Sequence, residues 1–156
     1  MSGAPSARAG RRLLLQRAGG LWLALQWRPA AAASGPESLQ AVVQRWAGGR
    51  PLREGRIGFE VAPLVENGNA VPVSVTVDSP MTAADHVQEI VIFNERNPQR
   101  EVARFTLTPA CGRAQVDARI RLATSQRLVA LARLSDGSQW ARYVDVIVTL
   151  AACVEA

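Results

Sequence analysis

The sequence predicts an all-β fold: an immunoglobulin-like antiparallel β-sandwich with a short N-terminal helix. The first observation is a strict alternation of apolar and polar residues, as in Val71-Pro72-Val73-Ser74-Val75-Thr76-Val77, which indicates a strand with one buried face. The second is a set of turn signals between such segments, including Asn97-Pro98 and Ser135-Asp136-Gly137-Ser138. The third is that no helical pattern separates the strands, which is typical of a sandwich. A small β-barrel is the alternative arrangement.

One short helix is expected before the strands. Ser34-Gly35-Pro36-Glu37 resembles a capping box with a proline in the first turn, and Gly48-Gly49 is a stop signal. We expect Trp46 to pack against the sheet. The apolar residues at helical spacing are Leu39, Val42, Val43 and Trp46.

Seven short strands are predicted after the helix. Segment 87–93 is apolar on both faces, which indicates a central or interface strand. Together with 128–134 it is expected to contribute to the core and to an interface with a partner subunit. In the last strand, Val144, Val146, Val148 and Leu150 are expected in the core. The strands are 57–64, 71–77, 87–93, 102–107, 116–122, 128–134 and 143–150.

The first 33 residues have the order of parts of an export signal. Gly10-Arg11-Arg12-Leu13 is a twin-arginine start, an apolar stretch follows, and Ala30 to Ala33 give a cleavage site. We therefore expect residues 1–33 to be a twin-arginine signal peptide and the protein to be periplasmic. The apolar stretch is too short to span a bilayer, so no membrane span is expected after signal removal. The alternative is an Arg- and Ala-rich disordered end of a cytosolic protein.

Charge argues against nucleic-acid and membrane-surface roles. The chain has 18 basic residues, all arginine, and 13 acidic residues. Five of the arginines and none of the acids lie in residues 1–33, so the remainder has 13 of each sign and no net charge. A neutral mature domain lacks the basic balance that nucleic acid or an anionic membrane attracts.

The sequence contains no recognisable catalytic or metal-binding pattern. His86 is the only histidine, which disfavours a histidine-rich metal site, and it is interpreted as a polar residue at a strand start. Glu60 and Glu66 are interpreted as strand and turn acids. Arg119 and Arg121 are interpreted as sharing a solvated or interface face of one strand. Because Cys-x-x-Cys, Gly-x-Ser-x-Gly and phosphate-loop motifs are also missing, we expect neither an enzyme nor a cofactor, and a redox enzyme is the weaker hypothesis.

The chemistry is expected at Cys153, close to the end of the chain. The predicted strand stops at Leu150, so residues 151–156 are expected to form a mobile C-terminal arm. A thiol on such an arm can enter the active site of another protein, which favours a carrier. No cation adjoins Cys153 in sequence, and Glu155 opposes ionisation of the thiol. The alternative is a disulfide with Cys111, or an idle thiol, and position alone does not decide between them.

Several stretches occur together in a characteristic order. They are Pro63 to Pro72, Asn97-Pro98, Arg119 to Leu122, Ser125-Gln126, Ser135-Asp136-Gly137 and Val146 to Thr149. Together these stretches resemble SoxY, the sulfur-compound carrier family of periplasmic thiosulfate oxidation, and the resemblance covers about residues 39–153. It implies a SoxY-like sandwich domain over residues 34–150, a heterodimer with a SoxZ-like β-sandwich subunit, and sulfur intermediates bound covalently to Cys153. It also implies transient contact with periplasmic sulfur-oxidising enzymes or cytochromes.

The arm departs from the family pattern, which reads Gly-Gly-Cys-Gly-Gly. Here Ala151 and Ala152 precede the cysteine and Val154 and Glu155 follow it, which is more similar to a SoxY-related paralogous group with an Ala-Ala-Cys-Ile-Glu arm. Alanine and β-branched valine restrict the backbone, and a glutamate is costly to bury unpaired. We therefore expect this arm to fit a different socket. The alternative function is a structural subunit of a sulfur-oxidation complex, with Cys111 as a structural or resolving thiol.

Overall fold

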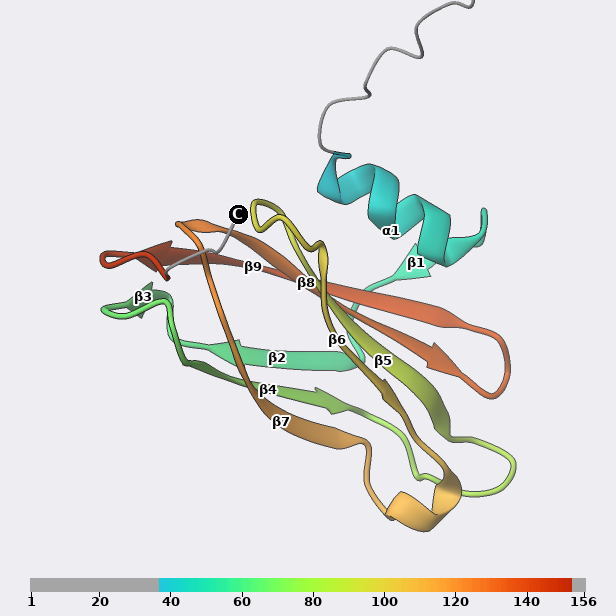
Figure 1. Ribbon diagram of the computed structural model, residues 1–156. Helices are drawn as coiled ribbons and strands as arrows, with labels where there is room; N and C mark the ends of the chain where they lie inside the picture. Colours follow the sequence, from blue (N-terminus) through green and yellow to red (C-terminus); the bar gives the residue numbers. More distant parts are fainter. Residues whose placement is uncertain (1–36, 153–156) are drawn as a thin grey trace, which may run out of the picture. The chain divides into compact units, whose positions relative to one another are not determined.

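Two packed sheets form the body of the molecule, as the computed structural model of residues 37–152 shows (Figure 1). The expected signal peptide, residues 34–36 and residues 153–156 lie outside the described part. The elements are α1 (Leu39–Ala47), β1 (Leu52–Arg53), β2 (Ile57–Val61), β3 (Leu64–Val65), β4 (Val71–Val77), β5 (Val87–Asn94), β6 (Glu101–Thr106), η1 (Pro109–Cys111), β7 (Gln115–Ile120), β8 (Gln126–Leu134) and β9 (Gln139–Val148).

The topology confirms the predicted sandwich. One sheet has the strand order β1-β9-β8-β5-β6, with β3 also paired to β9, and the other has the order β2-β4-β7. The long neighbours are antiparallel, whereas the two-residue strands β1 and β3 run parallel to β9. The predicted strand 57–64 is two strands in different sheets, and Pro63 lies at the change, where a residue without an N–H breaks the ladder.

The core lies between the two sheets. The alternating valines of β4 point into it and are at most 6% exposed. Strands β5 and β8 are buried on both faces: Ile90 and Ile92 face the other sheet, whereas Val91 and Phe93 lie under α1. The expectation that segment 87–93 is a central strand is therefore confirmed.

Helix α1 covers the outer face of the larger sheet. Ser38 is its N-cap, with its hydroxyl accepting from the Ala41 N–H at 3.2 Å. The expected capping box at residues 34–37 is therefore wrong, because the helix is capped four residues after Ser34. Gly48 ends the helix with φ 60°. Trp46 packs as expected, and the Arg133 guanidinium lies 4.8 Å from its ring centre.

This helix corrects one expectation about the partner interface. Val129 and Leu131 on β8 have no exposed surface, because α1 of the same chain covers them. Segments 87–93 and 128–134 therefore belong to the core as predicted, but they are not open to a partner.

Within residues 37–152, no helix has both the length and the hydropathy that a membrane crossing requires.

Candidate functional site

The described chain ends beside three loops at one end of the sandwich, where β9 finishes (Figure 1). We call this region the exit end; it comprises residues 66–70, 95–100, 121–125 and 149–152. Strand β7 leads into one of these loops, and β5 leads into another. The exit end is built from segments that are far apart in the sequence.

Backbone hydrogen bonds hold the end of β9 and the residues that follow it in place. The Ile147 N–H donates to the Pro63 carbonyl at 2.9 Å, and the Thr149 N–H donates to the Val65 carbonyl at 3.0 Å. The Gly68 N–H then donates to the Leu150 carbonyl at 2.8 Å. These bonds continue beyond the last residue of the strand, so the chain does not become free where β9 ends.

Ala152 is the last described residue, and it is fixed. Its N–H donates to the Leu122 carbonyl at 3.1 Å, and the residue is only 6% exposed. Ala151 is exposed, and Leu150 is 62% exposed, so the expectation that Leu150 belongs to the core is wrong because β9 has already ended at Val148. The predicted arm residues Cys153, Val154 and Glu155 lie outside the described residues.

Gly68 allows the close approach of these segments. A Cβ atom built on Gly68 would lie 2.9 Å from the Ala152 nitrogen and 3.2 Å from a methyl group of Val148, and it would clash with the Leu122 carbonyl oxygen. Only a residue without a side chain fits here. The sequence indicated a turn at residues 66–69, but not this reason for the glycine.

Asn97 ties two of the loops together. Its side-chain NH2 donates to the Arg121 carbonyl at 2.7 Å, and its oxygen accepts from the Ala123 N–H at 3.1 Å. Gln126, which is 5% exposed, donates to the same oxygen at 2.7 Å. Because both the oxygen and the NH2 group of the Asn97 side chain have hydrogen-bond partners, loop 121–125 has a defined position. The Leu122 carbonyl, which binds Ala152, is part of this loop.

Ser125 connects the same loop to β9. Its hydroxyl accepts from the Val148 N–H at 2.9 Å.

All but one of the stretches that suggested the family in the sequence meet at the exit end. The exception is Ser135-Asp136-Gly137, which forms the turn between β8 and β9 at the opposite end.

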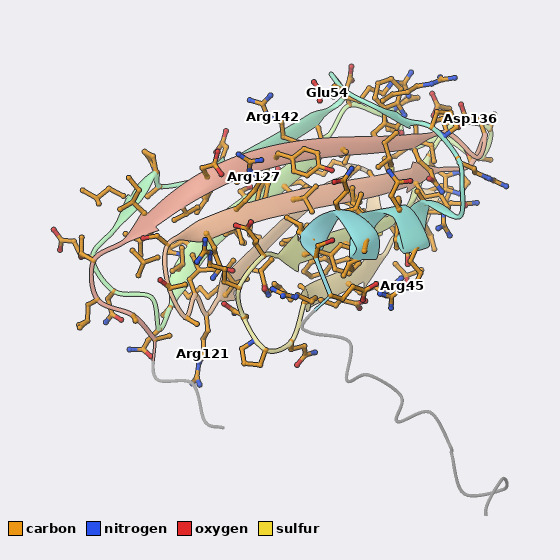
Figure 2. The ribbon with its side chains drawn as sticks, turned by 90° about the horizontal axis from the view of Figure 1, so that it is seen from above. Arg45, Glu54, Arg121, Arg127, Asp136 and Arg142 are labelled. Atoms are coloured by element: carbon orange, nitrogen blue, oxygen red, sulfur yellow. The ribbon has the colours of Figure 1, made fainter. Side chains whose placement is uncertain are left out.

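The exit end has unpaired positive charge. Arg119 and Arg121 are exposed and line a depression of about 210 Å³ with Asn97. Neither arginine is in an ion pair with another residue of the described part. Arg121 follows the end of β7, so only Arg119 lies on the strand, but both side chains are exposed, as the interpretation of a solvated face expected. Arg121 precedes Leu122, the partner of Ala152, and Figure 2 shows its side chain pointing outwards at this end.

An exposed apolar patch lies beside the exit end. Leu64 and Ile147 are paired in register between β3 and β9, and they are 56% and 59% exposed. Leu150 adds a third exposed side chain a few residues further along. We call these three residues the apolar patch. Large apolar side chains gathered on a surface are typical of a contact with another protein.

The other predicted site residues lie away from the exit end or are part of turns. Cys111 is exposed in η1, between β6 and β7, and forms no disulfide within residues 37–152. The His86 ring contacts the Thr82 carbonyl oxygen at 3.1 Å. Glu60 lines a shallow depression of about 920 Å³ on the β2-β4-β7 sheet, whereas the carbonyl of Glu66 accepts from the Thr149 hydroxyl at 3.2 Å. Residues 37–152 contain no group of three metal-ligating side chains.

Solved structures with a similar fold are superoxide reductases and related proteins. Superoxide reductase (neelaredoxin) from Ignicoccus hospitalis is 18% identical, with a TM-score of 0.55 over 60% of this chain and 80% of that chain. Superoxide reductase from Nanoarchaeum equitans is 11% identical, with a TM-score of 0.50 over 62% and 100% of the two chains. Hypothetical protein PH1083 from Pyrococcus horikoshii is 17% identical, with a TM-score of 0.52 over 61% and 95%. At these identities the likeness shows the β-sandwich fold alone.

The family is shown by sequence. The family model "Sulfur oxidation protein SoxY" matches residues 43–153, which is most of the chain and ends at Cys153. The protein therefore belongs to the SoxY family, whose role is that of a carrier in sulfur oxidation and whose partners are Sox proteins such as SoxZ. No curated protein matches the chain.

Proposed function

We propose that this protein is a periplasmic, non-catalytic carrier that binds a sulfur intermediate covalently on Cys153 and presents it to partner enzymes of sulfur-compound oxidation. One observation supports this most directly. The backbone is fixed by hydrogen bonds as far as Ala152 at the exit end, and the cysteine is the next residue. The family match ends at the same residue.

The anchoring of Ala152 suggests how the arm works. A single net hydrogen bond contributes only about 1 kcal/mol, and the bond from Ala152 to Leu122 is the last one described in the chain. Releasing it would lengthen the free arm by one or two residues at little cost. In this proposal, Ala152 exchanges between this bound state and a released state, in which the arm has a longer reach.

The covalent step needs an external electron acceptor. With a sulfur donor of the thiosulfate type, the Cys153 thiol loses its proton, a new S–S bond forms to the terminal sulfur of the donor, and two electrons pass to a cytochrome-type acceptor. The product is a mixed disulfide with a negatively charged sulfonate end. Arg119 and Arg121 offer positive charge on the surface from which the arm departs, which favours an anionic cargo.

Partner contact is assigned to the apolar patch. Leu64 and Ile147 are paired near the end of β9, Leu150 directly precedes the arm, and all three side chains are open to solvent in residues 37–152. A protein that receives the arm must cover this surface. The SoxZ-like subunit is proposed as a heterodimer partner on a different face, because α1 already covers the strands first expected to bind it.

The sequence of the arm restricts which sulfur donors and enzymes the carrier can work with. Ala151, Ala152, Val154 and Glu155 stand where the family has glycines, which supports membership of the paralogous group with an Ala-Ala-Cys-Ile-Glu arm. Such an arm is stiffer and bulkier than a glycine arm. We therefore propose that the sulfur donor, and the enzyme that accepts the arm in its active site, differ from those of standard thiosulfate oxidation.

The alternative, a structural subunit with a Cys111–Cys153 disulfide, is disfavoured by position. Cys111 lies before the first residue of β7, and Leu122 lies after its last residue. Ala152 is bound to Leu122, so it lies at the far end of this strand from Cys111. Six residues of strand separate these ends by about 20 Å, but the Cα atoms of a disulfide lie within about 7 Å of each other. The bridge would therefore require Ala152 to leave Leu122 and the arm to cross the length of the sheet.

The test is intact-mass analysis of the mature protein with its SoxZ-like subunit, a sulfur donor and an oxidant. We expect an added mass of sulfur or of a sulfonated sulfur on the wild type and on Cys111→Ser, and none on Cys153→Ser. No adduct on the wild type, under conditions that load an established SoxY carrier, would refute the proposal. Turnover of a thiol substrate by the single chain would instead support the redox-enzyme hypothesis.

A further inference from the structure

Three arginines gather at the end of the sandwich opposite the exit end. Arg50 follows α1, and its Nη1 donates to the Gly137 carbonyl at 3.1 Å. Arg53 and Arg56 reach the same end from β1 and from the link before β2, and their guanidinium carbons lie 5.9 and 5.2 Å from the ring centre of Trp140. Figure 2 shows blue-tipped side chains gathered around Asp136, far from Arg121.

The positive charge of this cluster is not neutralised by ion pairs. No carboxylate in residues 37–152 lies within 4.0 Å of these three guanidinium groups. Asp136 lines the same depression as Arg50 and Arg53, and its pKa lies below its usual value because Ser138 donates hydrogen bonds to it, with smaller contributions from Arg56 and Arg53. Even with Asp136 and Glu54 counted as negative, an excess of positive charge remains.

A depression of about 420 Å³ opens between Arg50, Arg53 and the turn, and Gln139 forms part of its lining. Gln139 is only 2% exposed, yet its side-chain oxygen has no hydrogen-bond partner. A buried amide oxygen without a donor is destabilising, so a partner that supplied the hydrogen bonds missing from this amide would stabilise it. Because no hydrogen bond fixes the orientation of this amide, either its oxygen or its NH2 group can face the depression.

The scaffold around the depression is rigid. Gly137 has φ 79°, which a residue with a side chain adopts only with strain. The Ser135 hydroxyl donates to the Ala84 carbonyl and accepts from the His86 N–H, both at 3.1 Å. Parallel pairing of β1 with β9 sets Arg53 beside Trp140. The donors are thus held in place before any ligand arrives, which lowers the entropic cost of binding.

We propose that this depression binds a small tetrahedral oxyanion of the sulfate or phosphate class, held by Arg50 and Arg53 and by the NH2 group of Gln139. Guanidinium groups present paired N–H donors that match such oxygens. A depression that ends on a buried amide suits a small anion better than an extended acidic surface of a protein does. The site does not involve Cys153, so it goes beyond the carrier function.

The test is thermal unfolding of the full chain in sodium sulfate, thiosulfate and phosphate, with sodium chloride at the same ionic strength as reference. We expect a saturable rise in Tm with one or more of the oxyanions and only a gradual change with chloride. In Arg50→Gln/Arg53→Gln, the affinity should fall by about tenfold or more. Arg142→Gln removes an exposed arginine of β9 that does not line the depression, so it should leave the affinity unchanged.

Two further variants make the outcome decisive. Gln139→Leu removes the unpaired amide, so the free protein should be at least as stable as the wild type but bind the anion more weakly. Cys153→Ser should bind like the wild type, which separates this site from the carrier function. Equal shifts in the wild type and in both depression variants, or a sulfate effect matched by chloride, would overturn the proposal.

Discussion

Gly68 shows how one residue determines the geometry of the exit end. A Cβ atom at this position would meet the chain on both sides, at the Leu122 carbonyl oxygen and at the Ala152 nitrogen. The N–H and carbonyl of Gly68 bind Leu150 and Leu122. The sequence marks this glycine only as part of a turn, because the residues that it touches are about 50 and 80 positions away.

We expect Gly68→Ala to destabilise the protein by about 1–3 kcal/mol, the usual cost of forcing an extra methyl group into a packed place. The added carbon must move the backbone at Leu122 or Ala152, so amide exchange of both residues should increase. Urea unfolding and hydrogen exchange measure the two effects. Gly58→Ala is the control, because its methyl group meets mainly the Thr76 hydroxyl side chain, and it should cost less.

A second prediction at this scale concerns Arg121. Arg121 adjoins Leu122, the residue that binds Ala152, and a single positive charge near a thiol in water changes the thiolate fraction by about two- to threefold. Arg121→Gln should therefore slow alkylation of Cys153 at neutral pH by about that factor, and added salt should reduce the difference. Arg142→Gln is the matched control. Equal alkylation rates in both variants would mean that Arg121 does not act on the arm.

At the scale of elements, α1 changes how the strands must be interpreted. Apolar residues on both faces of β5 and β8 predicted burial on both faces, and this is confirmed. The sequence could not tell whether a partner subunit or a helix of the same chain provides the second cover. Arg133 on β8 helps to hold the helix of the same chain on this face, since its guanidinium stacks on Trp46 and donates to the Trp46 carbonyl at 3.4 Å.

Leu131 tests the docking of this helix. The residue is fully buried under α1, so Leu131→Ala should lower the free energy of unfolding by about 2–5 kcal/mol. Leu150→Ala removes the same atoms from a side chain that is 62% exposed and should change stability by less than about 0.5 kcal/mol. Urea unfolding compares them, and similar effects would show that the helix is not docked.

For the whole molecule, the pattern of alternation was enough to predict the sandwich but not the site. Period-two segments identify strands locally, so β4 was found with its correct limits. The two-residue strand β1 was missed, and β3 was merged with β2 in the predicted strand 57–64, because a period needs more residues, although β3 helps to anchor the chain after β9. The exit end depends on the strand order and on hydrogen bonds between loops, and neither leaves a local signal.

Acid stability follows from the surface ion pairs of the sheet. Hydrogen bonds from Arg127 lower the pKa of Asp145, and those from Arg104 lower the pKa of Glu101. A carboxyl group whose pKa is lowered by folding contributes stability above its unfolded value, and this is lost as pH falls through the folded value. Stability should therefore decline below the ordinary values of 4.5 for Glu101 and 3.8 for Asp145.

Urea midpoints measured from pH 7 downwards check this expectation. The variant Glu101→Gln/Asp145→Asn should lose part of the acid-dependent slope, and Arg127→Gln/Arg104→Gln should lose a similar part. Because these groups are largely exposed, the effect should also weaken in salt. An unchanged slope in the carboxyl variant would assign the acid sensitivity to other groups.

The most direct measurement of the central claim is peptide mass mapping, without reduction, of protein taken from cells that are oxidising a sulfur compound. We predict that part of the C-terminal peptide contains Cys153 with one or more added sulfur atoms, and that the peptide of Cys111 remains separate. A complete Cys111–Cys153 bridge, or an unmodified Cys153 under every growth condition, would contradict the carrier account.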